Sequence, residues 1–327
     1  MERTTLGTRV TAALCLCYSV STTSPREAAS QVVGTELAAA VNLLDRDASL
    51  DGRLFVADDT PDVRCLMVVL QWGLGEVLYR SQDLRAALAG EGCGLLQLRI
   101  TNIHTPSAGV APSSQLVRNA GVAGSAGLAL LLEELADDAA RPGLTEVPLI
   151  FWGHSAAGTF GLTYAAMHPE RTLGFIRYNS HLRGVPVELV DLDRVPGLLI
   201  AGELDRTAGV DDTLELWARG RAIDAPWTLA IQPDGPHGSP EFLERANALL
   251  IPWVTAVARA RASSAGSETR VPTSAAWLGD PGTAEVWPSA QVTGSRSGLA
   301  WLPDEATAFG WQIVMRGGGA GPDPRYR

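Results

Sequence analysis

The sequence predicts an α/β fold in which helices cover both faces of a mostly parallel sheet. Short, continuous apolar runs alternate with longer stretches of helical spacing along most of the chain. Apolar runs without polar alternation are typical of strands that are buried on both faces, as in parallel sheets. The chain has 327 residues, of which 46% are hydrophobic and 19% charged, which is enough for a sizeable core.

Strands are predicted where an apolar run is bounded by turn residues, and helices where apolar residues recur every three or four positions. The expected strands are residues 54–57, 65–72, 94–100, 147–152, 173–177, 197–201 and 227–231. The expected helices are residues 76–89, 122–140, 156–167, 211–222 and 240–260. Gly90-Glu91-Gly92 ends the first helix and Pro142-Gly143 ends the second, while the Pro-, Ser- and Gly-rich residues 105–117 are predicted to form a loop.

The first 30 residues have the order of a secretory signal. Arg3 and Arg9 precede the apolar run VTAALCLCYSV, and small residues follow near Ser19-Val20-Ser21. The run is too short to span a bilayer as a permanent helix. We therefore predict a signal peptide or disordered leader over residues 1–30, and a secreted or periplasmic protein without stable membrane insertion.

The end of the chain differs from its middle. Residues 31–262 are predicted to form the main domain, and residues 263–327 a linker and an appendage with a disordered end. The appendage is expected to pack on the main domain, because tryptophans are usually buried. An aromatic platform that binds carbohydrate is the alternative. The tryptophans of this segment are Trp277, Trp287, Trp301 and Trp311.

Two cysteines lie outside the predicted leader. Cys65 and Cys93 each stand at or just before the start of a predicted strand. Neighbouring parallel strands bring such positions within bridging distance, and an exported protein can form the disulfide. Two buried free thiols are the open alternative.

Charge and motif content exclude several classes of protein. The net charge of −10 argues against a nucleic-acid partner, which usually requires a basic face. No HExxH motif, paired CxxC motif or acidic cluster indicates a metal site, and no Gly-Lys-Ser/Thr sequence indicates a phosphate loop. We expect no metal and no cofactor. The oligomeric state is left open.

Ser155 lies in the stretch FWGHSAAGTFG, between a predicted buried strand and a predicted helix. A serine on a sharp strand-to-helix turn is exposed as a nucleophile, provided that small residues stand two positions before and after it. Gly153 and Ala157 occupy those positions. A helix-capping serine is the simpler interpretation of this stretch taken alone.

The partners of a serine nucleophile are expected downstream in the order acid, then histidine. Asp205 follows the predicted strand that ends in AGELD, and Glu203 in the same stretch is the second choice for the acid. His237 lies in the turn GPHGS after the next strand. Because the carboxyl ends of parallel strands meet at one edge of a sheet, Ser155, Asp205 and His237 are expected to form a catalytic triad.

The oxyanion hole is expected from two backbone amides. The amide of Ala156 opens the helix after Ser155, and a second amide should come from the loop after the strand that begins at Cys65. Leu74 is the first choice in this loop and Trp72 the second.

Several other aromatic residues and histidines are weaker candidates. Trp72 and His181 are tentative substrate-binding residues, and Trp152 is expected either in the pocket or beneath the sheet. His154, His104 and His168 are expected to pack or to lie in surface positions rather than to catalyse.

The stretches GHSAAG, AGELD and GPHGS, in this order, resemble the α/β-hydrolase superfamily over roughly residues 50–262. The stretch VPLIFWGHSAAGTFG and the tail segments AWLGD and AWLPDEA are similar to exported bacterial serine esterases of the dienelactone-hydrolase-like and polyester-depolymerase-like group. The resemblance implies an α/β-hydrolase fold, a Ser155–His237–Asp205 triad and no cofactor. Dienelactone hydrolases themselves use a cysteine nucleophile, so the serine argues against that particular activity.

The expected reaction is cleavage of a small-molecule or polymeric carboxylic ester through an acyl-enzyme. In this fold a cap would lie within residues 178–196, a span too short for an elaborate lid, so an open site without a large cap is expected. Two alternatives remain. One is a peptidase or acyltransferase with the same triad, and the other is a non-catalytic carbohydrate- or surface-binding protein on a hydrolase scaffold.

Overall fold

A computed structural model of the chain describes residues 32–43, 48–102, 114–182, 190–262 and 276–318. All of them belong to one compact unit that spans residues 31–327. The predicted leader, most of the predicted loop over residues 105–117, the linker after residue 262 and the final residues lie outside the described part of the chain.

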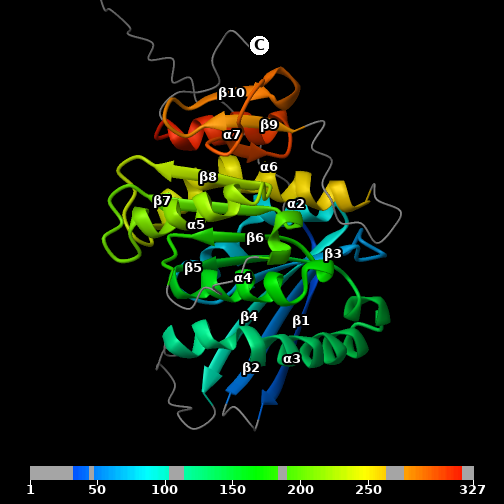
Figure 1. The fold of residues 1–327 in the computed structure, drawn as a ribbon. Helices are drawn as coiled ribbons and strands as arrows, with labels where there is room; N and C mark the ends of the chain where they lie inside the picture. The colour runs from blue at the N-terminus through cyan, green and yellow to red at the C-terminus, as the bar shows by residue number, and fades with distance from the viewer. Residues whose placement is uncertain (1–31, 44–47, 103–113, 183–189, 263–275, 319–327) are drawn as a thin grey trace, which may run out of the picture. The chain divides into compact units, whose positions relative to one another are not determined.

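The described chain is organised around an eight-stranded sheet with the order β1-β2-β4-β3-β5-β6-β7-β8 (Figure 1). Strands β4, β3, β5, β6, β7 and β8 pair in parallel, whereas β1 pairs with β2, and β2 with β4, in antiparallel fashion. The prediction of a mostly parallel sheet is confirmed. The strands are β1 (Gly34–Leu43), β2 (Ala48–Ala57), β3 (Cys65–Leu70), β4 (Cys93–Asn102), β5 (Leu149–His154), β6 (Thr172–Tyr178), β7 (Gly197–Gly202) and β8 (Trp227–Gln232).

Helices cover both faces of the sheet, as predicted. One apolar cluster lies between the sheet and α3, α4 and α5, and a second lies between the opposite face and α1, α2, α6 and α7. The apolar runs of β3, β5, β6 and β7 are buried at every position, because each strand has a helical layer on both sides. The helices are α1 (Gly75–Tyr79), α2 (Gln82–Gly90), α3 (Ser114–Asp138), α4 (Gly158–Met167), α5 (Val210–Ala222), α6 (Pro240–Ala262) and α7 (Glu305–Met315).

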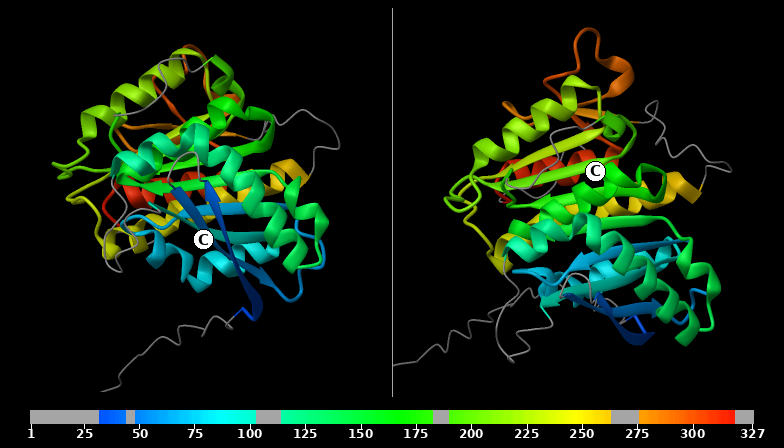
Figure 2. Two further views of the ribbon diagram at one scale, coloured as in Figure 1. Left: turned by 90° about the horizontal axis from the view of Figure 1, so that it is seen from below. Right: turned by 60° about the horizontal axis from the view of Figure 1, so that its bottom comes forward.

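The first two strands form a hairpin that is longer than predicted. β1 has no predicted counterpart, and β2 begins six residues before the predicted strand over residues 54–57. Figure 2 shows the two blue strands side by side with α3 alongside them. Polar and small residues such as Glu36 and Arg53 interrupt the apolar pattern here, because β1 is an edge strand and part of the hairpin faces solvent.

Two predicted helix boundaries differ from the structure. The helix predicted over residues 76–89 is divided into α1 and α2, because the Ser81 side chain accepts a hydrogen bond from the amide of Leu84 and starts a new helix. Helix α3 begins at Ser114 rather than at residue 122, so residues 114–117, which were predicted to lie in a loop, are helical.

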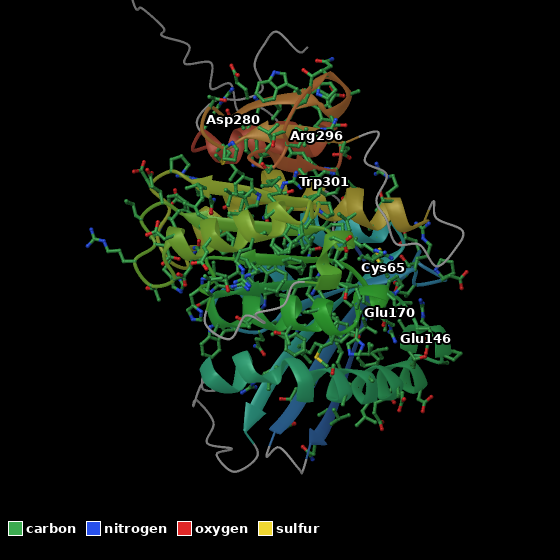
Figure 3. The ribbon with its side chains drawn as sticks, viewed as in Figure 1. Cys65, Glu146, Glu170, Asp280, Arg296 and Trp301 are labelled. Carbon is green, nitrogen blue, oxygen red and sulfur yellow. A yellow bond between two sulfur atoms is a disulfide. The ribbon has the colours of Figure 1, made fainter. Side chains whose placement is uncertain are left out.

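The last described segment is a small sheet and a helix that cover the edge of β8. Strands β9 (Trp277–Asp280), β10 (Glu285–Pro288) and β11 (Ala300–Leu302) are antiparallel, and Figure 3 labels Asp280, Arg296 and Trp301 on this segment. The indole of Trp311 in α7 donates a 2.5 Å hydrogen bond to the carbonyl of Leu229 in β8, and the amide of Ile231 donates to the sulfur of Met315. The carbonyl of Leu229 and the amide of Ile231, on the outer edge of β8, therefore find partners within the same chain.

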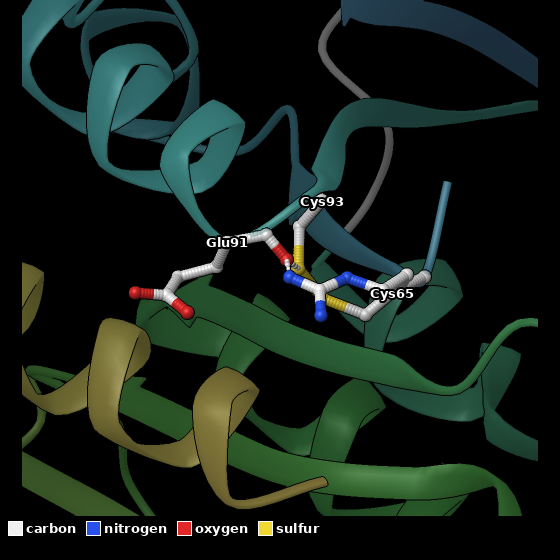
Figure 4. Close-up of a disulfide and its surroundings, with 4 residues drawn as sticks. Cys65, Glu91 and Cys93 are labelled. Atoms are coloured by element: carbon white, nitrogen blue, oxygen red, sulfur yellow. Dashed lines mark hydrogen bonds between the residues drawn. A yellow bond between two sulfur atoms is a disulfide. The ribbon is translucent and has the colours of Figure 1, made fainter. Parts of the chain in front are cut away.

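A disulfide joins the starts of β3 and β4 (Figure 4). Cys65 and Cys93 face each other in the parallel register, with their Cα atoms 4.6 Å apart. The sequence leaves open a disulfide or two buried free thiols, and the structure has the disulfide. Within the described residues, no helix is both long and apolar enough to cross a membrane.

Candidate active site

Ser155 stands on a tight turn between β5 and α4. Its φ is +56°, a left-handed conformation that is uncommon for residues other than glycine. A Cβ atom on Gly153 would lie 2.3 Å from the carbonyl of Ala157, so strand and helix approach too closely for any side chain at position 153. A Cβ atom on Gly158 would lie 2.6 Å from the Ser180 hydroxyl. The turn therefore depends on its small residues, and its shape presents Ser155 at the carboxyl end of β5.

Ser155, His237 and Asp205 form one hydrogen-bonded chain. The Nε2 atom of His237 lies 3.1 Å from the Ser155 hydroxyl, and the Nδ1 atom lies 2.8 Å from Oδ2 of Asp205. The three residues come from the turns after β5, β8 and β7, which end at the same edge of the sheet. The structure thus brings together the three side chains that the sequence singles out.

The environment of Asp205 differs from that of His237. The Asp205 side chain is 1% exposed, whereas that of His237 is 21% exposed and open to one side. The second carboxylate oxygen of Asp205 accepts hydrogen bonds of 2.8 and 2.9 Å from the amides of Thr207 and Ala208. Both of its oxygens therefore accept hydrogen bonds, which fixes the orientation of the carboxylate.

Glu203, the second choice for the acid, does not approach His237 in this way. Its side chain is exposed and accepts a 3.0 Å hydrogen bond from the amide of Asp234. Glu203 therefore supports the turn after β8 rather than the imidazole.

Asn179 links the turns that carry Asp205 and His237, and the sequence did not single it out. It follows β6, is buried, and has a φ of +48°. Its side-chain oxygen accepts a 2.7 Å hydrogen bond from the amide of Gly202, and its nitrogen donates a 3.1 Å bond to the carbonyl of Pro236, next to His237. No sequence motif identifies such a residue, because both partners are distant along the chain.

His154 lies directly beneath His237. Its side chain is buried, its ring centroid is 4.8 Å from that of His237, and neither ring nitrogen has a hydrogen-bond partner. Burial, with a smaller contribution from the nearby His237, lowers the pKa of His154 to about 4, so the ring is neutral at neutral pH. As expected from the sequence, His154 packs in the turn. It is a structural neighbour of the hydrogen-bonded chain rather than a member of it.

The two amides expected for the oxyanion hole lie on adjacent turns. Leu74 immediately precedes α1, and Ala156 lies in the short helical turn Ser155–Ala157. Gly73 has a φ of +56°, and a Cβ atom there would lie 2.0 Å from Nδ1 of His154. The turn that carries Leu74 therefore packs directly against the residue before Ser155.

A buried arginine is connected to the turn that carries Ser155 through one serine. Arg177 in β6 donates hydrogen bonds of 3.0 Å to the Ser180 hydroxyl and 2.6 Å to the carbonyl of His181. Ser180 in turn donates a 2.6 Å bond to the carbonyl of Ser155. His181, a candidate substrate-binding residue, is half-buried beside this arginine, whereas no motif in the sequence identifies Arg177.

The tryptophans near the site have different environments. Trp152 is fully buried and stacks on Tyr178 at a centroid distance of 6.2 Å. It belongs to the apolar cluster beneath the sheet, so of the two positions expected from the sequence it occupies the buried one. Trp72 is half-buried against the core cluster on the α3 side. Residues 183–189 of the possible cap region lie outside the described residues, and the described part that follows contains only a short helical turn, Val190–Arg194.

Metal ligands are not clustered in the part of the chain that the structure describes. No group of three or more histidine, cysteine, aspartate or glutamate side chains there has the arrangement needed to hold a metal ion.

Comparison with known proteins identifies the fold. No model of a protein family matches the sequence, and no curated protein matches it. Among solved structures, the acylaminoacyl peptidase of Pyrococcus horikoshii is 12% identical, with a TM-score of 0.50 over 72% of this chain and 44% of the peptidase. A cold-adapted esterase from an Arctic intertidal metagenomic library is 17% identical, with a TM-score of 0.49 over 68% and 93% of the two chains. A predicted CIB-like hydrolase from Thermoplasma acidophilum is 14% identical, with a TM-score of 0.42 over 68% and 99%.

The strand order, the parallel pairing and the similarity to the peptidase structure define the α/β-hydrolase fold. The fold class predicted from the sequence is confirmed. At sequence identities this low, the similarity supports only the fold assignment. The activity has to be inferred from the residues of the site.

Proposed function

We propose that this protein is a serine hydrolase that cleaves carboxylic esters through an acyl-enzyme. The observation that supports it best is the continuous chain of hydrogen bonds from Ser155 through His237 to the buried Asp205. A serine hydroxyl becomes a nucleophile when an imidazole takes its proton, and a buried carboxylate fixes the orientation and tautomer of that imidazole.

In the proposed mechanism, Nε2 of His237 accepts the proton as the Ser155 oxygen attacks the carbonyl carbon of the ester. Asp205 stabilises the imidazolium that forms, while the amides of Ala156 and Leu74 donate to the oxyanion. The protonated His237 then gives its proton to the leaving alcohol. A water molecule, activated by the same imidazole, releases the acid and regenerates Ser155.

We further propose that the protein works outside the cytoplasm. The disulfide between Cys65 and Cys93 fits an oxidising compartment, and the first 30 residues have the order of a secretory signal.

A peptidase with the same triad is the second candidate, since one of the solved structures with this fold is an acylaminoacyl peptidase. A panel of p-nitrophenyl esters with acyl chains of increasing length, run beside N-acylated amino-acid p-nitroanilides, separates the two. We expect turnover of the esters and much slower turnover of the anilides, with the Ser155→Ala variant as the background. Faster turnover of the anilides would replace the esterase proposal with the peptidase. Turnover of neither class would leave a binding protein as the better description.

A further inference from the structure

Arg177 is a buried cation at the carboxyl end of β6, close to the nucleophile turn. The residue is 3% exposed, and among the described residues the carboxylate whose charge acts on it is Asp212, which accepts a 2.8 Å hydrogen bond from the amide of Leu182. Its Nη1 atom has no hydrogen-bond partner, while Nη2 donates to the Ser180 hydroxyl and the His181 carbonyl. A buried charge without a salt-bridge partner is costly to the fold, so its position calls for an explanation.

Ser180 connects this cation to one particular peptide group. Its hydroxyl accepts the 3.0 Å hydrogen bond from Arg177 and donates a 2.6 Å hydrogen bond to the carbonyl oxygen of Ser155. That carbonyl shares its peptide bond with the amide of Ala156. Because the peptide group is conjugated, a donor at the carbonyl oxygen withdraws electron density from the nitrogen and makes its N–H a stronger donor.

We propose that Arg177 and Ser180 form a relay that polarises the Ser155–Ala156 peptide group, so that the Ala156 amide binds an oxyanion more strongly. The inference rests on the proposed function, and it adds two positioning residues to the site, neither of which touches the substrate. The relay is directional: each member donates to the next, from the guanidinium to the hydroxyl, from the hydroxyl to the carbonyl, and from the amide to the oxyanion.

Burial strengthens such a relay. Chains of hydrogen bonds polarise one another most in a medium of low dielectric constant, and Arg177 and Ser180 are both buried. Burial lowers the pKa of Arg177 to about 9, against an opposing contribution from Asp212, so the guanidinium keeps its charge at neutral pH.

The fit between Ser180 and the turn is close. Gly158, at the start of α4, leaves room for the hydroxyl, since a Cβ atom there would lie 2.6 Å from Ser180 Oγ. A smaller residue at position 180 is therefore tolerated sterically, whereas a larger one is not. Ala is the substitution that removes the hydroxyl without adding bulk.

The first experiment measures kcat and KM of Ser180→Ala with a p-nitrophenyl ester that the wild type hydrolyses. We expect kcat to fall about 5- to 30-fold, less than the 10²-fold or greater loss typical of removing an oxyanion donor itself. KM should stay within about twofold of wild type. Inhibition by an alkyl boronic acid, whose tetrahedral adduct carries the oxyanion, should weaken in parallel with kcat.

The second experiment tests whether the charge acts through Ser180. Arg177→Gln removes the charge, and it should lower kcat in the wild-type background but have little further effect in the Ser180→Ala background. Arg171→Gln is the matched control, because Arg171 also donates to two backbone carbonyls, those of Thr145 and Val147, but lies at the start of β6. This control should leave kcat unchanged.

The outcomes separate the relay from the proposed function. If the wild type hydrolyses no ester and fails to react with a fluorophosphonate, the proposed function is wrong and the relay with it. If the wild type is active and Ser180→Ala has wild-type kcat, the relay alone is wrong. Equal and additive losses from the two substitutions, accompanied by a higher KM and a lower melting temperature, would show that both residues merely support the turn and would also overturn the relay.

Discussion

The imidazole of His237 and the carboxylate of Asp205 are joined by a 2.8 Å hydrogen bond, although 32 residues separate them in the chain. The bond exists because the turns after β7 and β8 meet at one edge of the sheet. The amide of Leu204 donates to the carbonyl of Gly235, and Asn179 bonds to both turns. The orientation of His237 toward Ser155 therefore depends on a buried acid and on a shared backbone scaffold.

Replacing Asp205 with asparagine is predicted to remove most of the activity without unfolding the protein. Asparagine keeps the shape of the side chain, but its amide group can present an N–H to Nδ1 and stabilise the wrong tautomer of His237. We expect kcat to fall by about 10⁴-fold, with a circular dichroism spectrum like that of the wild type.

The matched control for that change is Glu203→Gln, two residues away. Glu203 is exposed, and glutamine keeps an oxygen that accepts from the amide of Asp234. Its kcat should stay within about twofold of wild type. A larger loss from Glu203→Gln than from Asp205→Asn would reverse the assignment of the acid.

Gly153→Ala is predicted to disrupt the nucleophile turn. The new methyl group would lie 2.3 Å from the carbonyl of Ala157 and 2.5 Å from the nitrogen of Gly158, both backbone atoms that cannot rotate away. We expect a loss of about 1–3 kcal/mol in the free energy of unfolding and a large loss of ester hydrolysis. Gly143→Ala is the control, since no atom lies within 4 Å of the methyl position there, and urea unfolding of the two variants compares them directly.

The buried His154 is predicted to make the protein sensitive to acid. The pKa of this imidazole is about 4 in the folded protein, below its ordinary value of 6.5. Between these pH values the unfolded chain binds a proton at this position and the folded protein does not, so the free energy of unfolding falls as the pH falls. Titration of His154 should lower the free energy of unfolding by roughly 2–3 kcal/mol between pH 6.5 and pH 4.

The measurement for His154 is urea unfolding at several pH values, for the wild type and for His154→Gln. The variant should show a shallower decline of stability toward pH 4. His168→Gln, at the half-exposed end of α4, is the control and should retain the slope of the wild type. Parallel curves for wild type and His154→Gln would contradict the depressed pKa.

The disulfide is predicted to contribute to stability but not to catalysis. Cys65 and Cys93 lie at the amino ends of β3 and β4, whereas Ser155 follows the carboxyl end of β5. In this parallel part of the sheet, the disulfide and Ser155 are therefore at opposite ends of the strands. Cross-linking residues 28 apart restricts the unfolded chain, so the double Cys→Ala variant should lose about 3–4 kcal/mol in unfolding free energy. Its kcat and KM at 25 °C should match the wild type, and a selective loss of kcat would indicate a link between this bond and the site.

The strands and the candidate triad could be predicted from the sequence because their signals are local. The runs of β3, β5 and β7 are apolar at nearly every position, and Ser155, Asp205 and His237 each follow such a run directly. The turn at Ser155 needs small residues at fixed positions, and that requirement is also readable from neighbouring residues.

The features that the sequence did not predict depend on contacts between segments that are distant along the chain. The alternating, partly polar β1 gives a weak strand signal, because it has water on one side. The partners of Asn179, Ser180 and the edge of β8 come from other parts of the chain, namely Pro236, Ser155 and Trp311. A single sequence contains no local pattern for interactions of this kind.

The proposed hydrolase activity depends on Ser155 as the nucleophile, and covalent labelling tests this role most directly. Wild-type protein and Ser155→Ala would be treated with a fluorophosphonate, digested and analysed by mass spectrometry, with circular dichroism as the check on folding. We predict one adduct on the wild type, on the peptide that contains Ser155, and none on the variant. An adduct on another residue, or ester hydrolysis that survives in folded Ser155→Ala, would contradict the account.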